Sequence, residues 1–321
     1  MLSSVLVIGG TGLIGRHLVI ASLDAGHPTA VLVRPATAAN AEKAKLTEAF
    51  QSCGASLVYG DINEHEGLVA AIKQADVVIS AVGHSSPLEV ESQLKIVTAI
   101  QEAGGVKQSQ QSPTVSSEYG CDVELAEHML EPARSILGAK LRVREAVRAA
   151  GIPHTIISSN WFQGFLLPRA GNPEANGPPV NSVTIFGDGK LQVFFVNEKD
   201  MGAVAMKAVE DPRTLNRILH LRPQDNLCSL DKLVSLWENK IGKVLEKIYV
   251  CEEELVKKVQ ESSFPLNFQL AVVHATIVAG ETKLSEKATS TGASISEAVE
   301  ATEIYPDMNY VCVEEYLDGL P

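Results

Sequence analysis

Short apolar runs alternate with segments of helical spacing along the first half of the chain. The apolar runs are predicted to be strands, at 4–8, 29–33, 56–59 and 76–82. The segments between and after them are predicted to be helices, at 13–25, 39–52, 64–74 and 89–103. Runs that are apolar at every position are typical of strands buried on both faces of a parallel sheet. The alternation predicts βαβ units, and therefore an α/β, Rossmann-type, doubly wound parallel sheet covered by helices on both faces.

A fifth strand is due after this alternation, but the sequence there is polar. Residues 108–117 read QSQQSPTVSS and carry almost no apolar side chains. This composition predicts a solvated loop with only a very short strand near 114–116. Residues 124–150 are predicted to be helical with a break at Pro132, and 154–158 to be a sixth strand.

The second half of the chain lacks this regular alternation. Strands at 183–186 and 191–196 flank Gly187-Asp188-Gly189, which predicts a β-hairpin. Helices are expected at 198–210 and 230–241, with a strand at 218–221 between them and mostly helical structure from about 252 onward.

Composition and charge exclude several classes of partner. The 321 residues carry a formal net charge of −12, and nucleic acids and anionic membranes both need a basic surface. The five cysteines are scattered, with no CxxC pair, which argues against a disulfide framework and against a structural zinc site. The N-terminus does not resemble a signal peptide, and the apolar stretch 268–280 is too short to span a bilayer. A cytoplasmic protein is expected, with no nucleic-acid or membrane partner.

A glycine-rich loop joins the first strand to the first helix. It consists of Gly9, Gly10, Thr11, Gly12, Leu13, Ile14 and Gly15. In such a loop the glycines permit a tight turn, a close approach of the backbone to a pyrophosphate and close helix packing. The helix N-terminus then offers free N–H groups to the phosphates. The sequence therefore predicts dinucleotide binding here, with a plain glycine turn as the alternative.

The end of the second strand favours NADP(H) over NAD(H). An acidic residue that could bind a ribose 2′-hydroxyl does not occur near Arg34 until Glu42. Arg34 suits a 2′-phosphate, and Lys43 would add a second positive charge, although lysines on helix faces are often only solvated.

We expect residues 1–157, with return segments at about 183–222, to form the NADP-binding Rossmann domain. Residues 158–182 and 223–321 are expected to form a smaller, mostly helical substrate-binding domain.

The candidate catalytic group is a lysine without the usual tyrosine. The Tyr-x-x-x-Lys pair of ordinary short-chain dehydrogenases is absent, because Ile136 stands four residues before Lys140. Lys140 and Arg144 share a helix face, and a neighbouring positive charge would lower the pKa of the lysine and make it a usable base. The alternative is a lysine that is only solvated. Ligands of open α/β sheets lie over the carboxyl ends of strands, where Val82 ends the fourth strand.

Four further residues are candidates with ordinary alternatives. Asn160, Trp161 and Phe162 follow the sixth strand, where an amide and aromatic rings suit a nicotinamide but suit core packing equally. His274, like His154, lies in an apolar context, for which a hydrogen-bonded core histidine is the alternative.

Several motifs together carry a family resemblance. Besides the glycine loop and Lys140-x-x-x-Arg144 they are VVISAVG at 77–83, SEYGCDV at 117–123, GIPHTIISSNWFQGFLL at 151–167, FGDG at 186–189, DPRTLN at 211–216 and YPDMNYVCVEEYL at 305–317. Over essentially its whole length the chain resembles the plant isoflavone reductase-like family. That family includes phenylcoumaran benzylic ether reductases, pinoresinol–lariciresinol reductases, isoflavone reductases and eugenol synthases, which are NADPH-dependent, NmrA-like, atypical short-chain dehydrogenases.

The resemblance implies a role for each matching residue. Lys140 falls on the family's catalytic lysine and Arg144 on a cofactor-side position. Arg34 and Lys43 fall on contacts to the 2′-phosphate. Asn160 and Phe162 fall on the nicotinamide wall, and His274 on a substrate-pocket histidine.

The chain departs from the family pattern at two places. Residues 108–117 replace an apolar strand that ends in Phe-Pro-Ser, and this puts the nicotinamide side of the pocket in question. Trp161 and Gln163 stand where the family has smaller residues, which would reshape the substrate pocket.

Two classes of function follow. The first is a reductase that transfers a hydride from NADPH to a phenolic phenylpropanoid, such as the benzylic ether of a phenylcoumaran neolignan or a related lignan or isoflavone, with Lys140 as general base. The second is an NmrA-like regulator that binds NADP(H) without catalysis. The sequence leaves open which substrate is used, the stereospecificity, and whether the chain forms a homodimer.

Overall fold

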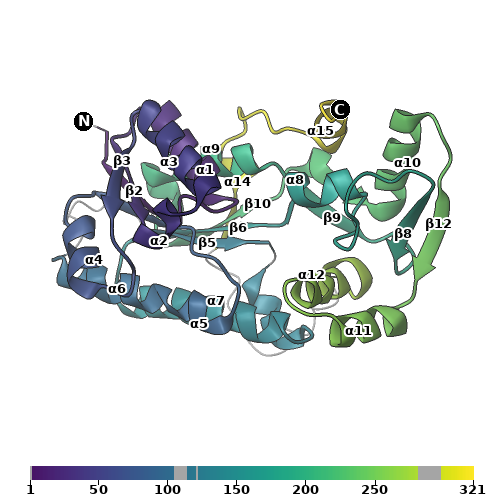
Figure 1. Ribbon diagram of the computed structural model, residues 1–321, viewed down its shortest axis with the longest axis horizontal. Coiled ribbons are helices and arrows are strands. Elements are labelled where there is room, and N and C mark those ends of the chain that lie inside the picture. The colour runs from purple at the N-terminus through teal and green to yellow at the C-terminus, as the bar shows by residue number, and fades with distance from the viewer. Residues whose placement is uncertain (1, 105–113, 121, 281–297) are drawn as a thin grey trace.

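The computed structural model describes residues 2–104, 114–120, 122–280 and 298–321. Its largest feature is an eight-stranded, all-parallel sheet with strand order β13-β10-β6-β5-β4-β1-β2-β3 (Figure 1). The strands of this sheet are β1 (Val5–Ile8), β2 (Thr29–Val33), β3 (Ser56–Tyr59), β4 (Val77–Ser80), β5 (Thr114–Tyr119), β6 (His154–Ser159), β10 (Arg217–Leu221) and β13 (Ala298–Glu300).

Helices cover both faces of the sheet, which confirms the predicted doubly wound fold. Val5 and Val7 of β1 pack into one apolar cluster while Leu6 and Ile8 pack into another, because successive side chains of a strand point to opposite faces. One face is covered by α1 (Gly15–Asp24), α3 (Ala41–Ser52), α9 (Glu198–Val209) and α14 (Ala301–Ile304), and the other by α4 (His65–Ile72), α6 (Gln93–Glu102) and α7 (Ala133–Ala149).

The very short strand expected near 114–116 is confirmed but is longer than predicted, because residues 114–119 form a six-residue strand and the solvated loop expected to reach 117 does not extend into it. Strand β5 lies between β4 and β6, with Val115 opposite Ile79 and Glu118 opposite Ser158. The ladder of a sheet is made by backbone groups and does not require apolar side chains, so composition alone could not exclude a strand here. Residues 108–113 of the same polar stretch lie outside the described residues.

The helices differ from prediction mainly at their boundaries. The helix expected at 89–103 is divided into α5 (Pro87–Glu91) and α6, which meet at Ser92. The predicted break at Pro132 is confirmed, since a 3₁₀ helix at Val123–His128 precedes it and α7 begins directly after it. A short helix, α2 (Pro35–Ala38), follows β2.

The second part of the molecule combines helices with two small sheets (Figure 1). Its strands are β7 (Trp161–Phe162), β8 (Ser182–Phe186), β9 (Gln192–Val196), β11 (Leu227–Ser229) and β12 (Glu246–Val250). Its helices are α8 (Gln163–Leu166), α10 (Leu230–Ile241), α11 (Glu252–Glu261), α12 (Leu266–Val273) and α15 (Val313–Asp318), and further turns are 3₁₀ at Leu167–Arg169, Pro212–Thr214 and Gln224–Asn226 and π-helical at His274–Val278. They enclose a separate apolar cluster that includes Phe186, Phe195 and Trp237.

The predicted hairpin at 183–196 is wrong, although its turn is present. Gly187 and Gly189 both have positive φ angles, but β8 pairs in parallel with β12 while β9 pairs with β11 and β7. The turn residues are local, but the partners of the two strands are distant: β8 pairs with β12, where Ser182 lies opposite Glu246, and β9 pairs with β11 and β7. The strands at 182–196 therefore lie outside the large sheet, whereas β13, which falls in the predicted substrate-binding domain, extends it.

Within the described ranges, no helix is both long and apolar enough to cross a membrane.

Candidate functional site

The glycine loop lies against the carboxyl end of β4, and three of its glycines are required by packing. Gly9 has φ +84°, and a Cβ there would lie 2.3 Å from the Ala81 carbonyl oxygen. A Cβ on Gly10 would lie 2.7 Å from the Val31 side chain, and one on Gly15 only 2.1 Å from the Gly9 carbonyl oxygen. These distances leave no room for a side chain, so the loop is held tightly between the strands and α1.

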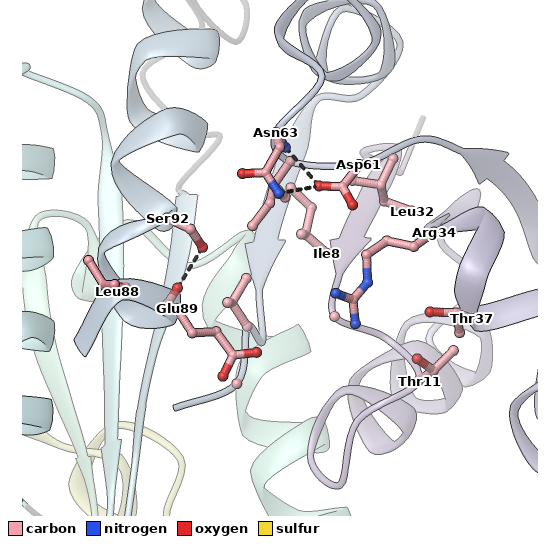
Figure 2. A pocket seen from close by; sticks show the side chains of 14 residues that line it. Ile8, Thr11, Leu32, Arg34, Thr37, Asp61, Asn63, Leu88, Glu89 and Ser92 are labelled. Carbon is pink, nitrogen blue, oxygen red and sulfur yellow. Dashed lines mark hydrogen bonds between the residues drawn. The ribbon is translucent and has the colours of Figure 1, made fainter. Parts of the chain in front are cut away.

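A groove runs over this loop and is made of two adjoining cavities of about 310 and 260 Å³. Gly9, Thr11, Arg34 and Val82 line both cavities, which places the loop and the ends of β1, β2 and β4 along one channel. Figure 2 shows the Arg34 side chain reaching into the first cavity near Thr11 and Thr37. Gly12, Leu13 and Ile14 also line the second cavity, whereas Gly10 and Gly15 line neither.

Two positive side chains line the second cavity from different elements. Arg34 follows β2, and Lys43 lies in the first turn of α3, whose N-cap Asn40 accepts hydrogen bonds from Glu42 N and Lys43 N. Asp61 lines the first cavity together with Arg34, and its Oδ1 accepts hydrogen bonds from Asn63 N and Nδ2 (Figure 2). The two cations make this part of the groove the best suited to binding a phosphate group.

At its other end, the groove contains Lys140, His84 and Phe162. Lys140 comes from the middle of α7 and is only 8% exposed, so it is not the solvated lysine of the alternative interpretation. His84 comes from the segment after β4, and Phe162 from β7. Three elements distant in sequence therefore bring a buried amine, an imidazole and a ring to one place.

An apolar cavity of about 130 Å³ opens beside this end of the groove. It shares Leu13, His84 and Phe162 with the groove, so the two spaces adjoin. The rest of its lining is mostly aromatic and aliphatic: Gly120, Leu137, Trp161, Phe165, Phe268, Gln269 and Val272. A cavity of this kind suits a flat, apolar ring.

The charge of Lys140 influences its neighbour His84. Burial, with the Lys140 charge as the second cause, lowers the pKa of His84 to about 4, and the carboxylate of Glu89 opposes this only in part. The imidazole is consequently neutral at physiological pH, with one nitrogen as donor and the other as acceptor.

Arg144 is expected on the cofactor side, and this position stays a prediction, because the structure shows the side chain in buried ion pairs. Its guanidinium is 1% exposed, donates from Nε to Glu118 Oε1 at 2.9 Å and from Nη2 to Glu118 Oε2, and pairs with Glu124 Oε1 at 2.5 Å. It lines none of the three cavities. Burial alone would lower the pKa of Arg144, but the hydrogen bond and charge of Glu118 raise it. Two carboxylates thus balance its charge, and the expected lowering of the Lys140 pKa by Arg144 loses its basis.

Of three other candidates, two line none of the three cavities and one lines the apolar cavity. His274 lines none of the three cavities, because its Nε2 lies 2.9 Å from Glu252 Oε1 on α11. Asn160 is buried and also absent from the cavity walls. Trp161 does line the apolar cavity, and its Nε1 donates to Thr276 Oγ1 at 3.0 Å, which fixes the indole.

Sequence reasoning missed His84 and the aromatic residues Phe165 and Phe268. A signal existed for His84, because it follows directly on the strand end that was already expected to face a ligand. The signal for Phe268 was weaker, since the apolar stretch that contains it resembles core sequence. No group of three or more His, Cys, Asp or Glu residues in the described ranges could hold a metal ion.

The fold and the groove together define a Rossmann-type dinucleotide-binding protein. The chain belongs to the NmrA-like family, whose model matches residues 1–317. It is 48% identical to eugenol synthase 2 of Clarkia breweri, over 98% of both chains. It is 46% identical to a phenylcoumaran benzylic ether reductase of Betula pendula, over 98% of this chain and 97% of the other.

Solved structures agree with this assignment and add the cofactor. A crystal structure of isoflavone reductase has 40% identity and a TM-score of 0.84, over 99% of both chains. The protein AtPrR2, solved with NADP+ and (+)-pinoresinol, has 36% identity and a TM-score of 0.85, over 99% of this chain and 98% of that one. Leucoanthocyanidin reductase of Vitis vinifera, solved with NADPH, has 34% identity and a TM-score of 0.82, over 98% of both chains. This chain is an NADP(H)-dependent oxidoreductase of the isoflavone reductase-like group.

Proposed function

We propose that this chain reduces the benzylic ether of a phenylcoumaran neolignan, or a related lignan or isoflavone, with Lys140 as general base. The observation that carries the proposal is the position of Lys140, a buried amine in the wall of the dinucleotide groove, at the end that adjoins the apolar cavity through His84 and Phe162. The relatives named as phenylcoumaran benzylic ether reductases, from Betula pendula and Pyrus communis, support this substrate class.

The residues of the groove fit NADP(H). The glycine loop presents backbone N–H groups and the start of α1 to the pyrophosphate, and Leu13 and Ile14 complete that wall. Arg34 and Lys43 would bind the 2′-phosphate. Val82 and Phe162 would border the nicotinamide, which supplies a hydride when bound.

Lys140 would act on a phenolic hydroxyl held between groove and cavity. In its neutral form the amine accepts the phenolic proton, and the electron pair left on oxygen moves into the ring. This expels the benzylic ether oxygen, which takes the proton from the Lys140 ammonium, and leaves an electrophilic, quinone-methide-like carbon. Once that carbon has accepted a hydride, the remaining phenolate takes a proton from solvent. Burial of the amine excludes bulk water from the same place.

The apolar cavity would hold an aromatic ring of the substrate. Phe162, Phe165 and Phe268 offer ring faces, and Trp161 is fixed by its hydrogen bond to Thr276. His274 would act only indirectly, because it lies outside the lining residues and packs against α11.

The environment of the protein is also a proposal. We infer a cytoplasmic location, which is supported by the free thiols of Cys53, Cys228, Cys251 and Cys312. A homodimer stays a prediction that analytical ultracentrifugation can test.

The proposal is tested by NADPH oxidation against a panel of a phenylcoumaran, a furofuran lignan and an isoflavone. Each is supplied with its phenol free and with the phenol O-methylated. We expect turnover of a free phenol, best with the phenylcoumaran, and none of the methyl ethers, because Lys140 then has no proton to take. Binding of NADPH without turnover of any member would favour the regulator and overturn the proposal.

A further inference from the structure

His84 occupies a position that the proposed reaction does not yet use. Among the residues that the structure describes, it is one of three, with Leu13 and Phe162, that line both the second cavity of the groove and the apolar cavity. The next residue is fixed by two hydrogen bonds, since Ser85 N donates to Glu89 Oε2 at 2.7 Å and Ser85 Oγ donates to the same oxygen. The imidazole is therefore held where groove and cavity meet.

The imidazole ring of His84 is oriented by packing rather than by hydrogen bonds. Its ring lies 5.0 Å from that of Phe268, tilted by 46°. In the part of the chain that the structure describes, neither ring nitrogen forms a hydrogen bond to protein. When a polar ring is held in place by packing against its faces, its nitrogens remain available to hydrogen-bond a ligand.

The groups around His84 decide what it can do. Lys140 and Glu89 are the charged groups that act on it. Burial is the largest cause of its lowered pKa, and it favours the neutral ring at pH 7 also when Lys140 is in the neutral form that accepts a proton. A neutral imidazole whose pKa is about 4 is a poor base, so it would not compete with Lys140 for a phenolic proton. It can still donate one N–H hydrogen bond to a developing negative charge.

We propose that the N–H of His84 hydrogen-bonds the phenolic oxygen of the substrate while Lys140 removes its proton. The phenolic O–H bond breaks, the proton passes to the Lys140 amine, and the electron pair stays on an oxygen that His84 stabilises. His84 gives up no proton in this step. The inference rests on the proposed function and assigns the second group that contacts the same oxygen.

The test measures ionisation of a bound phenol rather than turnover. The probe is 2-methoxy-4-nitrophenol, whose phenolate absorbs visible light, titrated in the complex of the protein with NADP+ so that no hydride is transferred. The variants are His84→Phe, which keeps a ring against Phe268, His84→Leu as a second apolar replacement, and His84→Gln, which keeps an N–H donor. His65→Phe is the matched control, because His65 is exposed and lines none of the three cavities.

We expect the bound probe to ionise at a higher pH in His84→Phe and His84→Leu, by about one to two pH units, because a hydrogen bond to a charged oxygen is lost. His84→Gln should stay near the wild type, and His65→Phe should match it. Equal ionisation pH in wild type and both apolar variants, or failure of the wild-type complex to bind the probe, would overturn the assignment of His84. A wild type that ionises the probe but turns over no member of the substrate panel would overturn the proposed function alone.

Discussion

Replacing Arg34 with Asp should reverse the cofactor preference of this protein. Arg34 and Lys43 line the same cavity, and the first acidic residue after β2 is Glu42. A hydrogen bond to a charged group contributes about 1.5–3 kcal/mol, and we take the lower half of that range because Arg34 is exposed. A carboxylate about 4 Å from a phosphate adds repulsion of about 1 kcal/mol for each unit of phosphate charge in a water-like medium.

These terms predict a weaker affinity of Arg34→Asp for NADPH by roughly 100- to 1,000-fold, with NADH affinity unchanged or improved. Titration calorimetry with both cofactors measures the ratio directly, and the loss should shrink as NaCl is raised, since exposed charges are screened. Arg217→Asp is the matched control, because Arg217 is exposed at the start of β10 and lines none of the three cavities. Equal affinities of the wild type for NADPH and NADH, or the same loss in the control, would refute the role of Arg34.

Two further predictions concern stability. Arg144→Ala should lower the free energy of unfolding by about 3–5 kcal/mol in urea titrations, because Glu118 is left buried without its cation. The control Arg142→Ala, on the exposed side of α7, should lower it by less than about 1 kcal/mol. Equal losses in the two variants would contradict this prediction. Burial raises the pKa of Asp200 to about 6, so the folded state binds this proton more tightly and stability increases as pH falls from above 6 toward 4. Asp200→Asn should therefore stabilise the protein at pH 8 by up to about 3 kcal/mol and little near pH 4, and a pH-independent difference would be the contrary result.

Much of the large sheet could be predicted because several of its strands, such as β1 and β4, are wholly or almost wholly apolar. Strand β1 is the clearest case, since each of its four side chains is buried, two on each face. Strand β5 could not be predicted in the same way, because its sequence is mostly polar and its backbone pairing with β4 and β6 is not visible in the sequence. The hairpin prediction was wrong for a related reason, since the local turn residues do not specify that β8 pairs with the distant strand β12.

The site was predictable where it follows strand ends and not where it depends on distant partners. The glycine loop, Arg34 and Val82 follow the ends of β1, β2 and β4. Arg34, Val82 and most of the loop line the groove. Spacing placed Arg144 on the same helix face as Lys140, but it could not reveal that Glu118, 26 residues earlier, takes up the guanidinium. The apolar cavity likewise depends on α12, which reaches the groove only through the fold of the second part.

The central claim is that Lys140 enables hydride transfer to a benzylic carbon. Single-turnover reduction of a phenylcoumaran by NADPH deuterated at C4 of the nicotinamide measures this directly, with the product analysed by mass spectrometry and NMR. We predict one deuterium at the benzylic carbon with the wild type, and for Lys140→Ala a rate lower by about 10²–10⁴-fold with NADPH affinity nearly unchanged. Deuterium at another position, or a Lys140→Ala protein that transfers it at the wild-type rate, would contradict the claim.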